Sequence, residues 1–246
     1  MIRVAAVADI HCGLESGGEF LAHAEALQAD ADVLLFAGDM TRHGDPAEAA
    51  VLARDLQELA LPRVAVLGNH DYHSDKQVEI RAILEAAGVQ VLEGETTVLQ
   101  VAGHDLGIAG MKGFGGGFTG ASGSAFGEPE MKAYYHHTEA LAAQFEESLH
   151  GLRGDVRVAL LHYSPVRDTC EGERPEIFPF LGSYLFADAI DRVPVDLVLH
   201  GHAHAGSEEG ATAGGVPVRN VAQMVIRKPY AVFELAGRDA VAPATA

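Results

Sequence analysis

Apolar and polar positions alternate in a regular way through the first third of the chain. Three short runs are apolar apart from one charged residue each, which is typical of buried strands: residues 2–8, 32–38 and 63–68. Three longer stretches repeat apolar residues at helical spacing: residues 19–29, 45–59 and 75–88. Asp45 followed by Pro46 is a typical helix start, and Gly88 is a typical helix end. Strand–helix repeats of about 30 residues predict βαβ units and a mostly parallel sheet.

The pattern changes after Gly88. Short strands with turn residues between them, over 89–113, predict antiparallel hairpins, and the Gly-rich segment 111–130 has neither a helix nor a strand pattern. The remaining pattern predicts one more helix and four more strands: helix 134–152 and strands 155–165, 194–204, 216–223 and 229–235. No repeat or linker is visible, so we expect one domain over 1–246, with the Ala/Pro-rich tail 237–246 frayed.

Composition narrows the function classes. The chain has 246 residues, 48% of them hydrophobic, which is ample for one large core. Its net charge of −18 disfavours nucleic acid polymers and anionic membranes as partners, because both would be repelled. Two cysteines give no disulfide framework, and no targeting segment or membrane-spanning run is visible. We therefore expect a cytoplasmic protein.

Polar residues follow five of the predicted strands. Because ligands of open α/β sheets bind at the carboxyl ends of the strands, these side chains are candidate ligands: Asp9, His11, Asp39, Asn69, His162, His202 and His204. Carboxylate, amide and imidazole donors suit Mn, Fe, Zn or similar ions, and seven donors fit two metals with one bridging carboxylate. Such a centre would also hold a local positive charge that attracts phosphate.

Each of these residues alone has a simpler explanation. A single Asp or His after a strand is more often a turn or cap residue. Five such placements at the same edge favour a functional site. The other histidines that we considered are assigned to surface, turn or helix-start positions instead: His23, His104, His136, His137 and His150.

These motifs resemble those of the calcineurin-like metallophosphoesterases. The resemblance rests on five motifs in order from residue 9 to 204: "DIH" (9–11), "GDMTRHG" (38–44), "GNHD" (68–71), His162 and "HGHAH" (200–204). It implies a four-layer α/β/β/α sandwich with a dinuclear metal site at the C-terminal ends of the strands. It also implies two ligand sets that share Asp39: one of Asp9, His11, Asp39 and His204, and one of Asp39, Asn69, His162 and His202.

The same resemblance suggests a reaction and a substrate class. "GDMTRHGDPAEA" is more similar to the phosphodiesterase branch than to the protein phosphatases, which implies hydrolysis of a small phosphodiester, such as a cyclic nucleotide or a glycerophosphodiester, by a two-metal-bridged hydroxide. The cofactors would be two metal ions (Mn, Fe, Zn or Mg), with Mn or Fe favoured. The alternatives are a phosphomonoesterase or protein phosphatase of the same fold, and a non-catalytic metal-binding scaffold.

Three further expectations concern residues near the ligands. His70 would protonate the leaving alkoxide, and Asp71 would either orient that imidazole or cap the following turn. Cys12, directly after His11, is either a small buried filler beside Gly13 or a thiol near the metals that makes the site sensitive to oxidation. The Gly-rich segment 112–126 is either a flap over the metals, in which Phe114 and Phe118 cover an apolar part of the substrate and Lys112 meets a phosphate, or a surface loop that its Phe residues anchor.

Overall fold

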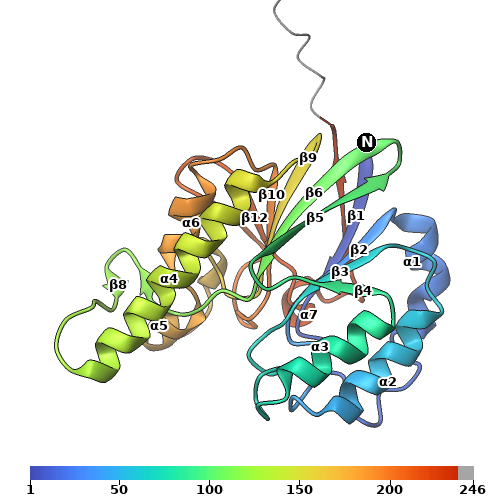
Figure 1. Cartoon of the computed structure of the whole chain (residues 1–246), viewed down its shortest axis with the longest axis horizontal. Helices are drawn as coiled ribbons and strands as arrows, with labels where there is room; N and C mark the ends of the chain where they lie inside the picture. Colours follow the sequence, from blue (N-terminus) through green and yellow to red (C-terminus); the bar gives the residue numbers. More distant parts are fainter. Residues whose placement is uncertain (238–246) are drawn as a thin grey trace, which may run out of the picture.

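The computed structural model describes residues 1–237, in which two sheets pack face to face between two layers of helices (Figure 1). This is the four-layer α/β/β/α arrangement expected from the sequence. The expectation for the tail concerns residues that, apart from Gly237, lie outside the described part. No helix within residues 1–237 is both long and apolar enough to cross a membrane.

The first sheet comes mainly from the N-terminal third of the chain. Its strands lie in the order β13 (Ala231–Leu235), β1 (Ile2–Val7), β2 (Val33–Ala37), β3 (Arg63–Val66) and β4 (Val89–Val91). All are parallel except β13. Helices cover its outer face: η1 (Leu21–His23), α1 (Ala24–Asp30), α2 (Pro46–Gln57) and α3 (Gln77–Ala86). The predicted cap is confirmed, since the Asp45 carboxylate accepts a 2.9 Å hydrogen bond from the Ala47 N–H.

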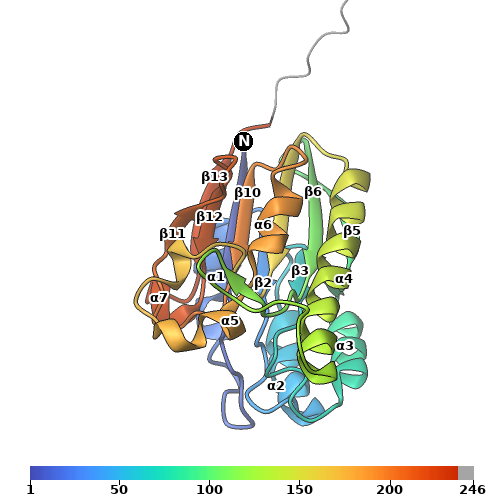
Figure 2. The ribbon, with the colours of Figure 1, turned by 90° about the vertical axis from the view of Figure 1, so that its left-hand side faces the viewer.

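The second sheet has six strands. Their order is β11 (Glu209–Ala211), β12 (Pro217–Asn220), β10 (Leu197–His200), β9 (Val156–Leu161), β6 (His104–Met111) and β5 (Glu95–Val101). The four inner strands are parallel and the two edge strands antiparallel. Figure 2 looks onto α4 (Pro129–Gly151) and α6 (Tyr184–Ile190), which pack on the outer face of this sheet.

The two sheets share a continuous apolar core. Alternate residues of β2, such as Val33 and Leu35, share one cluster with alternate residues of the neighbouring β9, such as Val158 and Leu160, and all four are fully buried. Because both inner faces are apolar over most of the strand length, the sheets hold a fixed relative position. That position brings their strand ends together at one edge of the molecule.

Two element predictions were wrong. β4 is not part of a hairpin but pairs in parallel with β3, because α3 returns the chain to the same edge of the first sheet; only β5 and β6 form the expected hairpin. The segment 111–130 contains a short hairpin of β7 (Gly117–Phe118) and β8 (Ala121–Ser122), and α4 starts at Pro129, which occupies the first helical turn.

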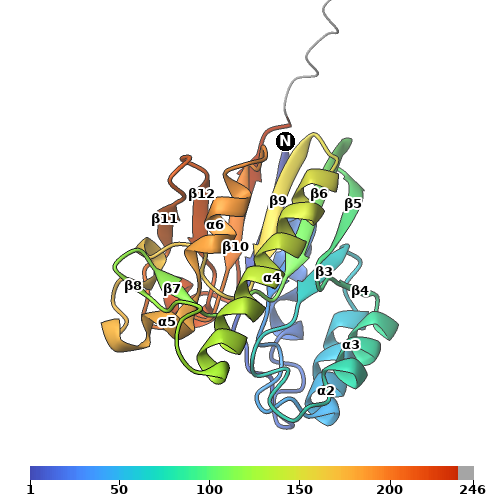
Figure 3. The ribbon, with the colours of Figure 1, turned by 60° about the vertical axis from the view of Figure 1, so that its left-hand side comes forward.

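The sequence pattern assigned no element to residues 166–193. The structure places there η2 (Asp168–Cys170), η3 (Pro175–Ile177), α5 (Phe178–Leu181) and α6, and a final short helix, α7 (Gln223–Ile226), follows β12. The hairpin of β7 and β8 lies beside α5, near the first turns of α4 (Figure 3).

Candidate metal centre and active site

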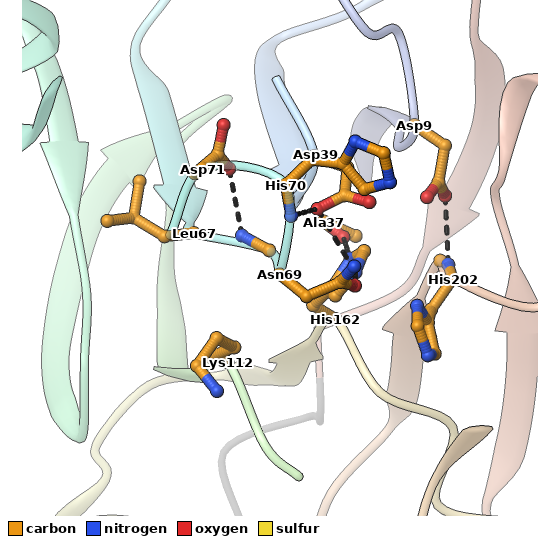
Figure 4. A network of polar contacts seen from close by, with 12 residues as sticks. Asp9, Ala37, Asp39, Leu67, Asn69, His70, Asp71, Lys112, His162 and His202 are labelled. Atoms are coloured by element: carbon orange, nitrogen blue, oxygen red, sulfur yellow. Dashed lines mark hydrogen bonds and ion pairs between the residues drawn. The ribbon is translucent and has the colours of Figure 1, made fainter. Parts of the chain in front are cut away.

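The candidate ligands lie where parallel strands of both sheets end. Asp9 and Asp39 follow β1 and β2 of the first sheet, Asn69 follows β3, and His162 and His202 follow β9 and β10 of the second. Figure 4 shows five of these side chains converging from loops of the two sheets. The pairing of the sheets therefore creates the site, since neither sheet carries all the donors.

The backbone at this edge is strained. Asp9, His11, Asp39 and His202 have positive φ angles of 58°, 44°, 52° and 69°, which non-glycine residues rarely adopt. Strained backbone of this kind gathers at functional sites, where the surrounding structure holds it in place. The strain turns each side chain out of the strand direction and into the shared edge.

Close packing explains the glycines beside the ligands. A Cβ atom at Gly68 would overlap the carboxylate of Asp39, and a Cβ atom at Gly201 would overlap the carboxylate of Asp9. Both glycines are therefore required by close approach. In the motifs "GN" at 68–69 and "GH" at 201–202, the glycine therefore leaves room for a carboxylate ligand that comes from another strand.

Two groups of donor atoms form at this edge. Asp9, His11, Asp39 and His204 each offer one ligand atom within 4.8 Å of the others, and Asp39, His162 and His202 form a second group by the same measure. Asp39 belongs to both groups, as expected for a bridging carboxylate. His204 Nε2 lies 2.9 Å from Asp9 Oδ1 in the first group.

Asn69 is the seventh candidate ligand and joins the second group. Its Oδ1 atom lies 2.9 Å from His162 Nε2, which in turn lies 3.4 Å from Asp39 Oδ1. The structure therefore brings together all seven side chains that the sequence analysis selected, in two sets that share Asp39.

Backbone carbonyls fix the ring orientation of the second-sheet histidines. His162 Nδ1 lies 2.8 Å from the Ala37 carbonyl oxygen, and His202 Nε2 lies 3.1 Å from that of Phe180. A carbonyl oxygen only accepts, so each of these nitrogens carries the proton. The other nitrogen of each ring then has a free lone pair, which is the state that binds a metal.

Burial sets the protonation states of the centre. It lowers the pKa of His11 to about 4 and that of His202 to about 3, so both rings are neutral at neutral pH. Burial also raises the pKa of Asp39, and the negative charges of Asp9 and Asp71 raise it further. Within residues 1–237, no Lys or Arg forms an ion pair with Asp9 or Asp39.

This charge distribution fits a bound cation. Asp9 and Asp39 are 2% and 1% exposed, and burying two neighbouring carboxylates without a cation is costly. Neutral imidazoles and carboxylate oxygens are the donors that Mn, Fe and Zn accept. The residues present therefore fit two metal ions, held by the two donor groups.

His70 lies at the edge of the first donor group. Its ring centroid is 4.4 Å from that of His11, and its backbone N–H donates a 2.8 Å hydrogen bond to Asp39 Oδ1. Its Nδ1 atom lies 2.7 Å from the Arg42 carbonyl oxygen and is therefore protonated. Nε2 is left available to face a substrate.

Asp71 has neither of the two expected roles, because the hydrogen bonds of its carboxylate within residues 1–237 come from preceding residues and not from the His70 ring or the following turn. Its fully buried carboxylate accepts hydrogen bonds from the N–H groups of Met40, Thr41 and Gly68 and from the Thr41 hydroxyl, at 2.7–3.3 Å. The group that holds the His70 ring is the Arg42 carbonyl. Asp71 instead ties together the two loops that carry Asp39 and Asn69.

The structure separates the three candidate substrate-binding residues. Phe118 is 2% exposed and packs on Phe178 at 6.2 Å between ring centroids, so it anchors the loop and cannot cover a substrate. Lys112 and Phe114 do line a cavity next to Asn69. Cys12 is buried, as expected, with its pKa raised to about 11 by burial, so its thiol is protonated.

Sequence reasoning missed other residues of that cavity. Tyr163, Glu93 and His137 also line it, and His137 had been assigned to a helix start. Tyr163 directly follows the candidate ligand His162 at a strand end, so the sequence alone could have predicted that it lies near the metal centre. Glu93 and His137 become neighbours only through tertiary packing.

A family model for calcineurin-like phosphoesterases matches residues 2–206 of the chain. The chain belongs to the calcineurin-like phosphoesterase family. It is therefore a hydrolytic enzyme, and this family depends on a dinuclear metal centre, for which the two Asp/His groups are the candidates.

Solved structures share the fold of this calcineurin-like phosphoesterase. Phosphopantetheinyl hydrolase (PptH) from Mycobacterium tuberculosis is 19% identical with a TM-score of 0.67, over 91% of this chain and 90% of that one. TT1561 of Thermus thermophilus is 18% identical with a TM-score of 0.52, over 89% and 88%. A search of curated proteins by sequence found no significant match. These identities are low, so the two structures establish the fold of this phosphoesterase and leave its substrate open.

Proposed function

We propose that the chain hydrolyses a small phosphodiester at a dinuclear centre, with Mn or Fe as the favoured metals. The observation that carries the proposal is the pair of donor groups that share Asp39, with His70 beside the first of them. The cyclic nucleotides and the glycerophosphodiesters are the leading substrate classes. The neutral Asn69, in place of a third carboxylate, keeps the loaded site positive enough to attract an anionic diester.

The proposed ligand sets follow the geometry. One metal would be held by Asp9, His11, Asp39 and His204, and the other by Asp39, Asn69, His162 and His202. When bound, the two ions would lower the pKa of a coordinated water and neutralise charge on the phosphoryl oxygens. The histidines contribute by being held neutral and correctly turned before any metal arrives.

His70 would donate the proton that the leaving alkoxide needs. Its Nδ1–H is held by the Arg42 carbonyl, so the proton to be transferred is the one on Nε2 of the doubly protonated ring. An alkoxide is a strong base, and a positioned acid typically accelerates its departure by ~10²–10⁴-fold. This role favours diesters of alcohols over phosphate esters with acidic leaving groups.

The test combines metal content with a choice of substrates. The purified protein should contain about two metal ions per chain, and it should hydrolyse bis-p-nitrophenyl phosphate with a higher kcat/KM than p-nitrophenyl phosphate. A screen of 3′,5′- and 2′,3′-cyclic nucleotides and glycerophosphodiesters would then identify the natural class. Preference for the monoester would overturn the diester assignment in favour of a phosphomonoesterase, and metal without turnover would favour a binding scaffold.

A further inference from the structure

A cavity of about 370 Å³ opens beside the candidate metal centre, at the end of β6. We call it the side pocket; the residues that line it include Asn69, Tyr72, Glu93, Lys112, Phe114 and Tyr163. Its volume lies in the range of small-molecule sites. Asn69 belongs to both the pocket and the second donor group, so a molecule bound at the metals can extend into the pocket.

Aromatic rings dominate the walls of the side pocket. Phe114 lies 5.9 Å from Tyr163 and 4.8 Å from His137, measured between ring centroids. Tyr163 also contacts His202, at 4.3 Å, so one wall of the pocket is continuous with a candidate metal ligand. Rings arranged in this way favour a flat, apolar guest, because offset and edge-to-face contacts add to the burial of apolar area.

Lys112 is the cationic group of this pocket. Its ammonium lies 5.0, 5.1 and 5.3 Å from the ring centroids of Tyr72, Phe114 and Tyr163. Within residues 1–237 its one hydrogen bond is donated to the Gly113 carbonyl oxygen, at 3.2 Å, and it forms no ion pair. An ammonium has three donors, so two remain for a guest.

The acidic residue of the pocket already has partners. Glu93 accepts a 2.9 Å hydrogen bond from the Tyr72 hydroxyl and a 3.3 Å bond from the Leu67 N–H. It therefore does not consume the free donors of Lys112. Burial lowers the pKa of Lys112, and the charges of Glu93 and Asp39 oppose that shift.

The position of His70 decides which part of a diester faces the pocket. His70 packs on His11 and is absent from the pocket lining, and Figure 4 shows His70 and Lys112 on opposite sides of Asn69. If His70 protonates the leaving group, that group departs away from Lys112. The ester group that stays on phosphorus then faces the side pocket.

We propose that the side pocket binds the ester group that remains on phosphorus, and that it selects an aromatic or heteroaromatic ring bearing a hydrogen-bond acceptor for Lys112. A nucleoside has this chemistry, whereas glycerol does not. The inference rests on the proposed diester hydrolysis, and it narrows the substrate to ring-bearing diesters. Phe114 and Lys112 act here as specificity-determining residues.

Three diesters that share a 2,4-dinitrophenolate leaving group test the proposal. Their other ester groups are methyl, phenyl and 4-acetylphenyl, so the leaving group is constant and does not need a proton from His70. We expect kcat/KM to rise by about tenfold or more from methyl to phenyl, because the ring is buried. It should rise about tenfold again to 4-acetylphenyl, where the ketone accepts from the Lys112 ammonium.

Matched variants assign each step of this series to its residue. Phe114→Ala should reduce the phenyl-to-methyl ratio at least threefold, while Phe126→Ala, at a residue of the same loop that is 85% exposed, should leave it unchanged. Lys112→Met should remove the gain from the acetyl group and keep the ring preference. Lys132→Met, on the exposed face of α4, is its control.

Binding of phosphonates gives a second measurement that does not depend on turnover of diesters. The Kd values of methyl-, phenyl- and 4-acetylphenylphosphonate for the metal-loaded protein, measured by titration calorimetry, should follow the same order and the same variants. If only monoesters are hydrolysed but this order holds, the diester function fails and the pocket assignment stands. Equal kcat/KM and equal Kd across the series would overturn the pocket assignment.

Discussion

Replacing Asp39 by Asn should raise the free energy of unfolding of the metal-free protein. When metal is present, the same substitution should weaken metal binding and abolish turnover. Without metal, the Asp39 carboxyl is buried beside Asp9, and no Lys or Arg among residues 1–237 forms an ion pair with either group. Asn has nearly the same shape, and its carbonyl oxygen can still accept the hydrogen bond that the His70 N–H donates to Asp39 Oδ1. The substitution therefore removes a carboxyl that must be protonated on folding, at little steric cost.

Two estimates of the stabilisation agree. If Asp39 stayed ionised, its charge would lie within 4.8 Å of that of Asp9, and the two unit charges would repel by about 3.5 kcal/mol at an effective dielectric constant of about 20. Alternatively, burial raises the pKa of Asp39 from 3.8 to about 9, so the carboxyl becomes protonated when the protein folds at pH 7. Because pH 7 lies about 3 units above the pKa of the unfolded state, this protonation costs about 4 kcal/mol. The two describe one effect, so we expect Asp39→Asn to gain about 3 kcal/mol.

The same shift sets the direction of the pH dependence. A carboxyl whose folded pKa is raised binds more protons in the folded state between 3.8 and about 9. The metal-free wild type should therefore lose up to about 1.4 kcal/mol of stability per pH unit as pH rises through that range. Metal-free Asp39→Asn should lack this slope, and its advantage over the wild type should shrink toward about pH 4.

Urea unfolding of chelator-treated protein at several pH values measures these differences. Asp71→Asn is the matched control, because its buried carboxylate accepts three backbone N–H bonds that an amide NH₂ group would oppose. That variant should lose about 1–3 kcal/mol with or without metal. The reasoning would be refuted if metal-free Asp39→Asn were no more stable than the metal-free wild type, or if it still bound two metals and turned over normally.

Three other predictions concern His70, Phe118 and the metal ions. His70→Ala should reduce kcat/KM by ~10²-fold or more for an alkyl diester and by far less for a p-nitrophenyl diester, since the acidic leaving group needs little protonation; equal losses would indicate a positioning role instead. Phe118→Ala should lower the free energy of unfolding by about 3–5 kcal/mol because its ring is buried, with KM unchanged in the folded protein; a raised KM with normal stability would restore the flap hypothesis. Chelation should abolish turnover, and added Mn or Fe should restore it better than added Mg does. A colorimetric assay of bis-p-nitrophenyl phosphate hydrolysis, combined with metal analysis, would measure the recovery, and equal recovery with Mg would contradict the metal preference.

The strands and their polar ends were predictable because they depend on local sequence. A parallel strand buried on both faces must be continuously apolar, so the first polar residue marks its end, as Asp39 does after β2. The ends of parallel strands meet at one edge, which makes the ligand set visible without coordinates. The α2 cap at Asp45 was predictable for the same reason, since its partner is two residues away.

Features that depend on distant neighbours could not be read from the sequence in this way. Asp71 follows His70 directly, yet its carboxylate binds backbone about 30 residues away, and the His70 ring is held by the Arg42 carbonyl. The side pocket is a stronger case, because Glu93 and His137 come from different layers of the fold. β4 was misassigned because three strand residues pair equally well with either neighbour until the helix before them fixes the direction of the chain.

The sharing of donors between the sheets ties metal binding to the packing of the fold. Each donor group draws on both sheets, since His204 joins Asp9 in the first and His162 joins Asp39 in the second. The His162 Nδ1–H also bonds the Ala37 carbonyl of β2, so a cross-sheet hydrogen bond is already in place without metal. The apolar core between the sheets holds these donors close together against the repulsion of Asp9 and Asp39. Substitutions that loosen that core, far from any ligand, should therefore weaken metal affinity as well as stability, whereas substitutions in the outer helical layers should affect stability alone.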